Sequence, residues 1–418
     1  MATMLETAGV AFPDALEGLE WPEDALVHVP YWVYTSQAVY QRELERIFYG
    51  PTWSYVGFAD EIPNAGDYKR GWIGERSVIL TRSEDGEISV LENICAHRGM
   101  QLIWEERGNK QDIVCPYHQW CFSMKGDLQG VPLRRGIKGQ GGYPKDFNTS
   151  QHGVRRLRHA NRHGVIWATF SDDAPSFEEY CGEAMPNVDR LLDHGTVKVL
   201  GYQRQVIPCN WKMYMENLRD PYHATLLHTF YITFGLWRAD NRSELSSTPD
   251  GRHAITTSEN TGKKHTEATA QIARFDDALT LQDPDLVTPL KEFDDDRIAG
   301  SHLHPSLIVG QQANSLAMRQ VVPKGPDKME LIWTFFGYEE DTPELTLRRI
   351  KHANLLGPAG IVSIDDSEVL KYCQKAARGF PDNAAYVEFG GRDEQASHML
   401  TEAQIRSFYR HYRSVMGF

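Results

Sequence analysis

Apolar and polar residues alternate over short stretches in the first part of the chain, from about Thr52 to Phe170. This period of two predicts short β-strands separated by turns that contain Gly, Asn and Asp. The expected strands include residues 53–57, 77–81, 88–92 and 164–170, with turns at 64–67 and 84–86 and a hairpin signal at Gly126-Asp127. We therefore expect a small all-β domain.

The pattern changes after residue 171 to a mixture of helical and strand periods. Helices are expected over 175–192, 210–234 and 401–416, and strands over 197–206, 306–310, 316–322 and 329–338. The final helix places Ile405, Phe408, Tyr409, Tyr412 and Met416 on one apolar face. These elements predict an α+β domain with an antiparallel sheet. The expected organisation is an N-terminal segment, 1–47, packed on the α+β domain, a β domain at 48–170 and the α+β domain at 171–418.

Composition narrows the class of protein. The 418 residues are 41% hydrophobic and 24% charged, as in ordinary globular proteins, and exceed the size of one efficient core. A net charge of −13 argues against a nucleic-acid partner. No apolar run reaches the roughly 18 residues of a membrane span, and residues 1–12 lack the basic run of a signal peptide. We expect a cytoplasmic protein without a disulfide framework or a membrane partner.

Two Cys-His pairs lie inside the expected β domain: Cys95 with His97, and Cys115 with His118. Two thiolates on one iron and two imidazoles on the other are the ligands of a Rieske [2Fe–2S] cluster, which accepts electrons. The same four residues could also form a tetrahedral zinc site. Gly99 and Pro116 favour the cluster, since they predict two tight loops around a compact cofactor.

A second group of candidate ligands contains no cysteine. His223 and His228 are five residues apart, which separates their directions by about 140° on a regular helix, but Pro221 predicts a kink or a new helix start near Asp220. Two imidazoles and a carboxylate form the facial triad of non-haem Fe(II) oxygenases. The third ligand must come from elsewhere in the chain. Taken alone, such a His pair is more often structural.

These residues carry a resemblance to the large (α) subunits of Rieske non-haem iron aromatic-ring-hydroxylating oxygenases. The family pattern N-W-K…E-N…D-x-Y-H…H is similar to residues 210–223 followed by His228. The resemblance implies an all-β Rieske domain, and a catalytic domain whose antiparallel sheet is flanked by helices in a helix-grip, START-like fold. It also implies that His223, His228 and Asp366 ligate a mononuclear iron. Asp365 competes with Asp366, and either acid could instead serve a helix N-terminus.

The resemblance also implies how electrons travel. Electrons from NADH would pass through a ferredoxin reductase and a ferredoxin to the cluster, and then to the iron, where O2 reacts with the aromatic substrate. Asp220 would bridge His118 of one subunit to His223 of its neighbour, which requires an oligomer, usually a ring of three. The expected assembly is a homotrimer or an α3β3 complex with a small β subunit.

Residues 136–142, 314–320 and 353–360 resemble the branch that acts on aromatic carboxylates. A carboxylate entering an apolar pocket needs a cation or several donors. The resemblance assigns this role to Arg319, for which the alternative is an Arg on the polar side of a strand. Gln312, Ser363 and Asn217 are expected as further substrate contacts. No second Arg stands near residues 396–399, which favours a monocarboxylate such as salicylate. Terephthalate, anthranilate and benzoate are the alternative substrates, and an electron-transfer protein without oxygenase activity is the alternative class.

Overall fold

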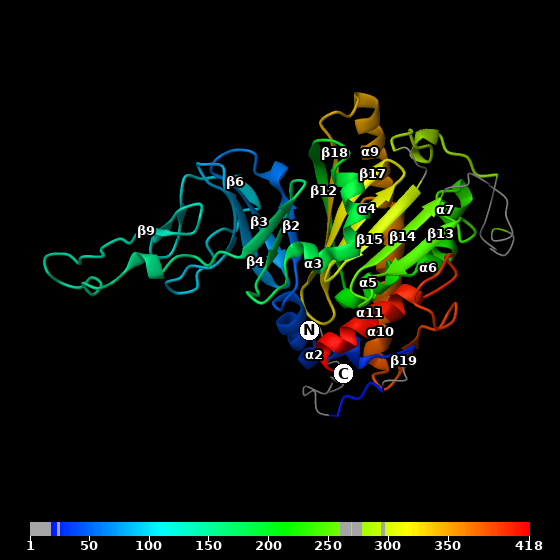
Figure 1. Ribbon diagram of the computed structural model, residues 1–418, viewed down its shortest axis with the longest axis horizontal. Coiled ribbons are helices and arrows are strands. Elements are labelled where there is room, and N and C mark those ends of the chain that lie inside the picture. The colour runs from blue at the N-terminus through cyan, green and yellow to red at the C-terminus, as the bar shows by residue number, and fades with distance from the viewer. Residues whose placement is uncertain (1–17, 23–25, 260–268, 270–277, 294–296) are drawn as a thin grey trace, which may run out of the picture.

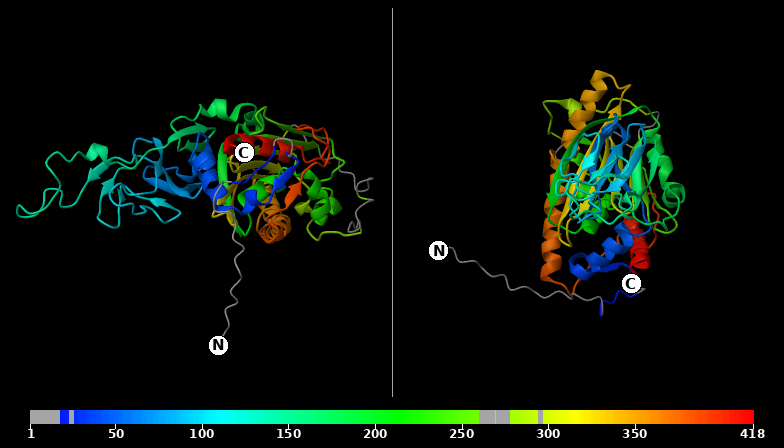
Figure 2. Two further views of the ribbon diagram at one scale, coloured as in Figure 1. Left: turned by 90° about the horizontal axis from the view of Figure 1, so that it is seen from below. Right: turned by 90° about the vertical axis from the view of Figure 1, so that its left-hand side faces the viewer.

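The computed structural model describes residues 18–22, 26–259, 269, 278–293 and 297–418. A β domain extends from one end of a larger α+β domain, as Figure 1 shows, and the views in Figure 2 agree. None of the helices in these described ranges combines the length and apolar composition needed to cross a bilayer. The domain boundaries at residues 47 and 170 stay predictions.

Three small antiparallel sheets build the β domain. Their strand orders are β5-β4-β3-β6, β10-β11-β2 and β7-β8-β9. The strands are β2 (Ser54–Phe58), β3 (Asp67–Ile73), β4 (Arg76–Arg82), β5 (Ile88–Glu92), β6 (Arg107–Asn109), β7 (Ile113–Val114), β8 (Cys121–Phe122), β9 (Leu128–Gly130), β10 (Arg158–Arg162) and β11 (Val165–Thr169), with 3-10 turns at Ala59–Glu61 and Thr149–Gln151. The expected strands and the hairpin at Gly126, where φ is +88°, are confirmed.

A seven-stranded antiparallel sheet forms the centre of the larger domain. Its strand order is β12-β18-β17-β16-β15-β14-β13. These strands are β12 (Val197–Ile207), β13 (Ser243–Ser247), β14 (Ala254–Glu259), β15 (Arg297–Leu303), β16 (Leu307–Gln312), β17 (Ser315–Pro323) and β18 (Met329–Tyr338). The sequence predicted β12, β16, β17 and β18 but not β13, β14 and β15. The sheet and its flanking helices confirm the expected α+β class (Figure 1).

Helices cover the sheet and join it to the chain ends. They are α1 (Trp32–Thr35), α2 (Gln37–Glu43), α3 (Phe177–Cys181), α4 (Met185–Leu192), α5 (Trp211–Asn217), α6 (Pro221–Leu227), α7 (Thr229–Phe234), α9 (Pro343–Leu356), α10 (Ile361–Gly379) and α11 (Ala403–Met416), with a π-helix at Leu44–Phe48 and 3-10 turns at Gly182–Ala184 and Pro284–Leu286. The short strands β1 (His28–Pro30) and β19 (Ala384–Tyr386) pair with each other.

The largest core joins α1, α2, α5 and α11 to the sheet, and its centre contains a buried ion pair. The Nζ atom of Lys212 lies 2.5 Å from Oε1 of Glu43, and both side chains are fully buried. Trp211 and Tyr412 also donate to the Glu43 carboxylate, at 2.8 and 2.6 Å. These donors compensate the loss of hydration, and they fix α5 against α2 and α11.

The expected helix over 210–234 is three helices. Asp220 caps α6, since its Oδ1 accepts from the amides of Tyr222 and His223 at 3.0 and 3.1 Å. Pro221 takes the first helical position, where a missing amide costs nothing. The second break falls on His228, whose ψ of 77° ends α6 and starts α7. The expected helix start near Asp220 is thus confirmed.

Candidate metal centres and substrate cavity

Two loops of the β domain have the same backbone hydrogen bonds. Gly99 donates to the carbonyl of Cys95 (3.0 Å), and Cys95 donates to the carbonyl of Met100 (2.8 Å). In the other loop Gln119 donates to Cys115 (2.9 Å), and Cys115 donates to Trp120 (2.8 Å). Gly99 and Gln119 occupy equivalent positions with φ of +72° and +58°. Cys95 and Cys115 therefore occupy equivalent places in the two loops, whereas His97 follows its cysteine by two residues and His118 by three.

The four side chains of these loops fit a shared cofactor. Cys95 and Cys115 are free, buried cysteines. The His97 and His118 rings are 4.6 Å apart, and the Nδ1 atom of each is buried without a hydrogen-bond partner. An unsatisfied buried nitrogen is costly unless a ligand or metal satisfies it. Trp120 stacks on His97 with centroids 4.8 Å apart and fixes that ring.

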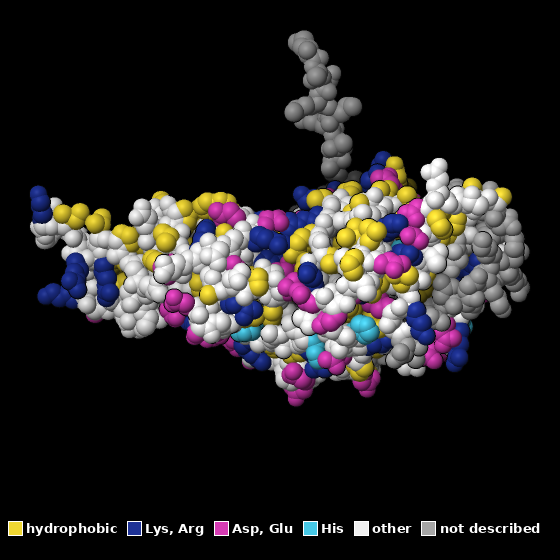
Figure 3. Space-filling view, turned by 90° about the horizontal axis from the view of Figure 1, so that it is seen from above, with side chains coloured by type: hydrophobic (Ala, Val, Ile, Leu, Met, Phe, Trp, Pro, Cys, Tyr) yellow, Lys and Arg dark blue, Asp and Glu magenta, His cyan; other side chains and the backbone are white. Residues whose placement is uncertain are grey.

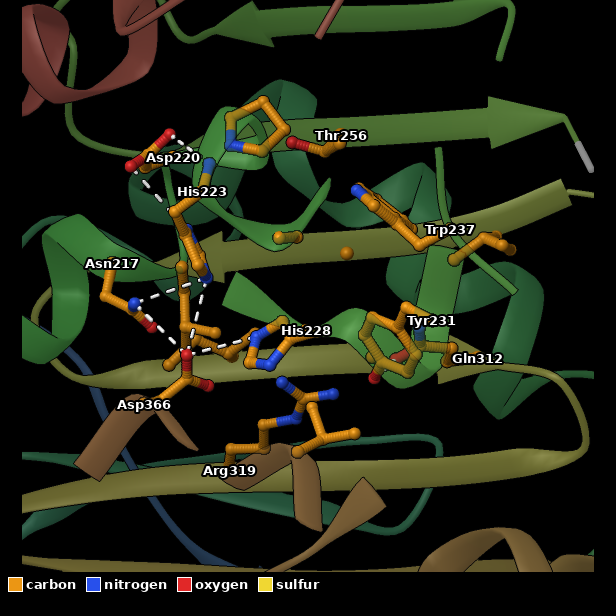
Figure 4. Close-up of a pocket in the computed structure, with 18 of the residues that line it drawn as sticks. Asn217, Asp220, His223, His228, Tyr231, Trp237, Thr256, Gln312, Arg319 and Asp366 are labelled. Atoms are coloured by element: carbon orange, nitrogen blue, oxygen red, sulfur yellow. Dashed lines mark hydrogen bonds and ion pairs between the residues drawn. The ribbon is translucent and has the colours of Figure 1, made fainter. Parts of the chain in front are cut away.

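The second centre lies where α6, the break at His228 and α10 meet. Ligand atoms of His223, His228 and Asp366 all lie within 4.8 Å of one another (Figure 4). Oδ1 of Asp366 is 3.4 Å from Nε2 of His223 and 3.2 Å from Nε2 of His228. Among the described residues, no other three groups of this kind lie so close to one another.

The same criterion bears on the zinc alternative for the cluster loops. The ligand atoms of Cys95, His97, Cys115 and His118 are spread more widely than the ligands of a single tetrahedral zinc ion.

The other nitrogen of each imidazole faces a second carboxylate. Nδ1 of His223 is 3.6 Å from Asp220, and Nδ1 of His228 is 3.3 Å from Asp365. The contact of His228 is a hydrogen bond, which fixes the orientation and tautomer of that imidazole and leaves its Nε2 free for the metal. The contact of His223 is an ion-pair distance, and its Nδ1 makes no hydrogen bond. Burial opposes charge on Asp366, but His223 and His228 hold the pKa of its carboxyl well below the usual value. The donor set thus fits a divalent cation such as Fe(II).

Of the two expected substrate contacts Asn217 and Ser363, only Asn217 lies at the metal centre and lines the cavity. Nδ2 of Asn217 lies 3.3 Å from both Nε2 of His223 and Oδ1 of Asp366, at the metal centre itself (Figure 4). Ser363 is buried, donates to Oε1 of Gln205 at 3.2 Å, and is not among the residues that line the cavity. The expectation that Ser363 contacts substrate therefore finds no support, because its hydroxyl is engaged with β12.

A cavity of about 730 Å³, including the space at its mouth, opens beside the second centre. Arg319 and Gln312 line it, as expected from the sequence. The guanidinium of Arg319 lies 4.0 Å above the Trp333 ring, its Nε is buried without a partner, and Gln312 accepts from the Tyr231 hydroxyl at 2.9 Å.

Sequence reasoning missed His302, Trp237 and Thr256, which also line the cavity. His302 lies on β15 and Thr256 on β14, two strands that contain glycine, serine and threonine and show no strong apolar alternation. Only the pairing of strands shows that these side chains face the metal centre.

Two family models match the chain. The Rieske [2Fe-2S] domain matches residues 52–140, and the ring hydroxylating alpha subunit (catalytic domain) matches residues 188–417. The large oxygenase component of salicylate 5-hydroxylase from Ralstonia sp is 45% identical over 407 residues, which are 95% of this chain and 96% of that protein. The anthranilate 1,2-dioxygenase large subunit from Burkholderia cepacia is 44% identical and covers 97% of both chains.

A third relative and a solved structure agree with this result. A terephthalate 1,2-dioxygenase terminal oxygenase subunit alpha from Comamonas sp is 38% identical, over 96% of this chain and 98% of that protein. Naphthalene 1,2-dioxygenase from Rhodococcus sp., in its crystal structure with indole bound, has a TM-score of 0.79 and 26% identity over 94% of this chain and 95% of that chain. The chain therefore belongs to the ring-hydroxylating oxygenase α subunits, enzymes that carry a Rieske [2Fe–2S] cluster and a mononuclear iron.

Proposed function

We propose that this α subunit hydroxylates the ring of an aromatic monocarboxylate, with salicylate as the first candidate, using O2 and electrons delivered by partner proteins. The observation that carries the proposal is Arg319. It is the one Arg or Lys among the described residues that line the cavity. Two of the most similar relatives are named for salicylate and anthranilate, which are both aromatic monocarboxylates.

Arg319 is suited to bind a carboxylate. Trp333 supports one face of the guanidinium, and the buried Nε has no partner in the protein. A substrate carboxylate would replace its lost hydration with charge-assisted hydrogen bonds to this group. A single cation in the cavity favours one carboxylate over two, which disfavours terephthalate. Gln312 and Asn217 add amide groups at other parts of the wall.

His223, His228 and Asp366 would hold the iron, and the bound iron supplies the activation of O2. Asp220 and Asp365 would keep the two imidazoles in the orientation that directs Nε2 to the metal. Asn217 lies against this centre and would position a ligand beside it. The apolar cavity wall would keep the aromatic ring close to the metal and limit bulk water.

Cys95, His97, Cys115 and His118 would hold the cluster, which receives electrons from NADH through a ferredoxin reductase and a ferredoxin. The loops that carry these residues lie in the β domain, whereas α6 and α7 lie at the far end of the larger domain (Figure 1). An electron that stayed within one chain would have to cross most of the molecule. Transfer between neighbouring subunits avoids this distance.

Exposed apolar side chains surround both ends of the proposed transfer route. Ile94, Trp104, Val114 and Tyr117, on or near the cluster loops, are 46–54% exposed. Leu226, six residues after Asp220 in the chain, is 50% exposed. Phe389 is 41% exposed and stacks on Tyr222 with centroids 4.3 Å apart. Exposed apolar patches of this kind are typical of protein interfaces.

We propose that these two surfaces join in a head-to-tail ring of three subunits, so that His118 faces the partner's Asp220. The segment after β9 supports this arrangement. It extends away from the body and carries exposed Leu133 and Ile137 together with basic residues (Figure 3). Repetition of one unlike pair of surfaces closes a ring. A small β subunit would complete the assembly as α3β3.

Product analysis tests the function. The purified holoprotein, supplied with a ferredoxin and its reductase, is incubated in parallel with salicylate, anthranilate, benzoate and terephthalate. Hydroxylated salicylate formed with NADH and O2 consumption supports the proposal. A protein that passes electrons from ferredoxin to an external acceptor but oxidises none of the four would instead be an electron-transfer protein.

A further inference from the structure

A row of side chains crosses the sheet beneath the cavity. The strand registers pair His302 of β15 with Ile308 of β16, and Ile308 with Arg319 of β17. Residues directly opposite each other in antiparallel strands project to the same face. His302, Ile308 and Arg319 all line the cavity. His302 and Arg319 therefore face the same space from two strands apart.

The next row of the same face is made of glycines. Gly300 and Gly310 are cross-strand partners, and both line the cavity. A Cβ on Gly310 would lie 3.5 Å from Nη2 of Arg319, and a Cβ on Gly300 would lie 3.8 Å from Nε2 of His302. The Arg319 guanidinium thus lies over Gly310 and the His302 imidazole over Gly300. Cβ atoms placed on these two paired glycines would be about 5 Å apart. The two polar heads therefore lie over the same part of the cavity floor, although His302 and Arg319 stand two strands apart.

The His302 ring has unused hydrogen-bonding capacity. It is 3% exposed, and its Nδ1 is buried without a partner. Burial, with the charges of Arg219 and Arg319, holds the pKa of His302 well below the usual value. A neutral imidazole offers one donor and one acceptor. Nε2, which lies nearest to Gly300 of the cavity floor, is the nitrogen that a ligand N–H or O–H in the cavity can reach.

We propose that His302 binds a hydroxyl or amino group on the ring carbon next to the carboxylate that Arg319 holds, so that the cavity selects ortho-substituted benzoates. This inference rests on the proposed function and narrows its substrate class. Gly300 and Gly310 leave room for the ring beneath both groups. Benzoate would leave the imidazole unpaired, which costs affinity without preventing binding.

Binding measurements on the anaerobic holoprotein test the proposal with salicylate, anthranilate and benzoate as probes in isothermal titration. The native protein is expected to bind both ortho-substituted acids more tightly than benzoate by about 5- to 100-fold. His302→Phe keeps an aromatic ring of similar size but should reduce this ratio to near one and leave benzoate affinity unchanged. His302→Gln, which retains a polar head, should restore part of the ratio.

His159→Phe is the matched control, because it makes the same substitution at an exposed residue of β10 outside the cavity, and its ratio should equal that of the native protein. Equal affinity of the native protein for all three acids would overturn the role of His302 and leave the proposed function standing. An unchanged affinity ratio in His302→Phe would also overturn the role of His302. The same holds if His302→Phe lowers the affinity for all three acids equally and His302→Gln recovers none of it. Failure of the native protein to bind any of the three would instead contradict the proposed function.

Discussion

Asp365 and Asp366 are consecutive in the chain, but their carboxylates approach opposite nitrogens of His228. Oδ2 of Asp365 is 3.3 Å from Nδ1, and Oδ1 of Asp366 is 3.2 Å from Nε2. Neighbouring residues on a helix diverge by about 100°, so the two acids of α10 reach the ring from different sides. Asp366 also approaches His223, which Asp365 does not. The two acids therefore have separate expected roles.

Asp366→Asn should empty the mononuclear site, because it removes the one carboxylate that faces both Nε2 atoms. Asp365→Asn should keep the site but lower iron affinity by about 10- to 100-fold, as losses of an orienting partner do. Elemental iron analysis after dialysis against graded chelator measures both effects, and the visible spectrum of the cluster is the internal control. Iron lost only in Asp365→Asn would reverse the assignment.

Asp220→Ala should retain both metals and suppress turnover strongly. The side chain caps α6 and faces Nδ1 of His223, so its loss should weaken electron delivery while the Cys/His loops, in another domain, stay intact. Asp220→Asn is a useful companion because it keeps a capping oxygen. Steady-state rates, compared with the rate at which ferredoxin reduces the cluster, give the readout. A nearly normal turnover number would contradict the bridging role.

Arg319→Gln should raise the Kd for salicylate by about 10- to 100-fold, since hydrogen bonds to a charged group contribute roughly 1.5–3 kcal/mol. Arg319→Lys should recover only part of the affinity, because an ammonium lacks the planar fork that binds a carboxylate in bidentate fashion. Titration with the neutral analogue salicylamide is the control, and its affinity should change little. An equal loss for acid and amide would show that Arg319 only supports the cavity wall.

Glu216 makes stability depend on pH. Its carboxylate accepts from the hydroxyls of Tyr34 and Tyr409, and burial raises its pKa from 4.5 to about 7. The native state thus keeps a proton that the unfolded chain has released. This contribution, up to about 3 kcal/mol, is complete below the unfolded pKa and is lost as pH rises through about 7.

Glu216→Gln should remove that part of the pH dependence. Between about pH 5 and pH 8, the thermal midpoint of the native holoprotein should fall further than that of the variant. Thermal unfolding followed by circular dichroism measures the difference. Parallel pH curves for the two proteins would show that the carboxyl does not change protonation in this range.

Local patterns predicted much of the fold. The bounds of β5 and β18 agree with the sequence expectation, because both strands are runs rich in apolar residues, with β-branched side chains in β5 and aromatic ones in β18. Pro221 marked the start of α6. The break at His228 carries no such signal, since Leu227-His228-Thr229 contains no proline or glycine. Packing of α6 and α7 around the site overrides local helix propensity there.

The candidate site was predictable where the chain itself brings residues together. Cys95 with His97 and His223 with His228 are close in sequence, so their spacing carried information. His302 meets Arg319 only through the register of three strands, which no local pattern contains. The division of roles between Asp365 and Asp366 likewise depends on how α10 is rotated against His228, which packing determines.

The central claim is that this chain inserts oxygen from O2 into the ring of an aromatic carboxylate. A single-turnover experiment tests it most directly, with holoprotein whose cluster has been chemically reduced, salicylate and 18O2, in the absence of ferredoxin and reductase. We predict hydroxylated product that contains 18O, in an amount that follows the loss of reduced cluster. Product labelled only from water, or cluster oxidation without any product from salicylate, anthranilate or benzoate, would contradict the account.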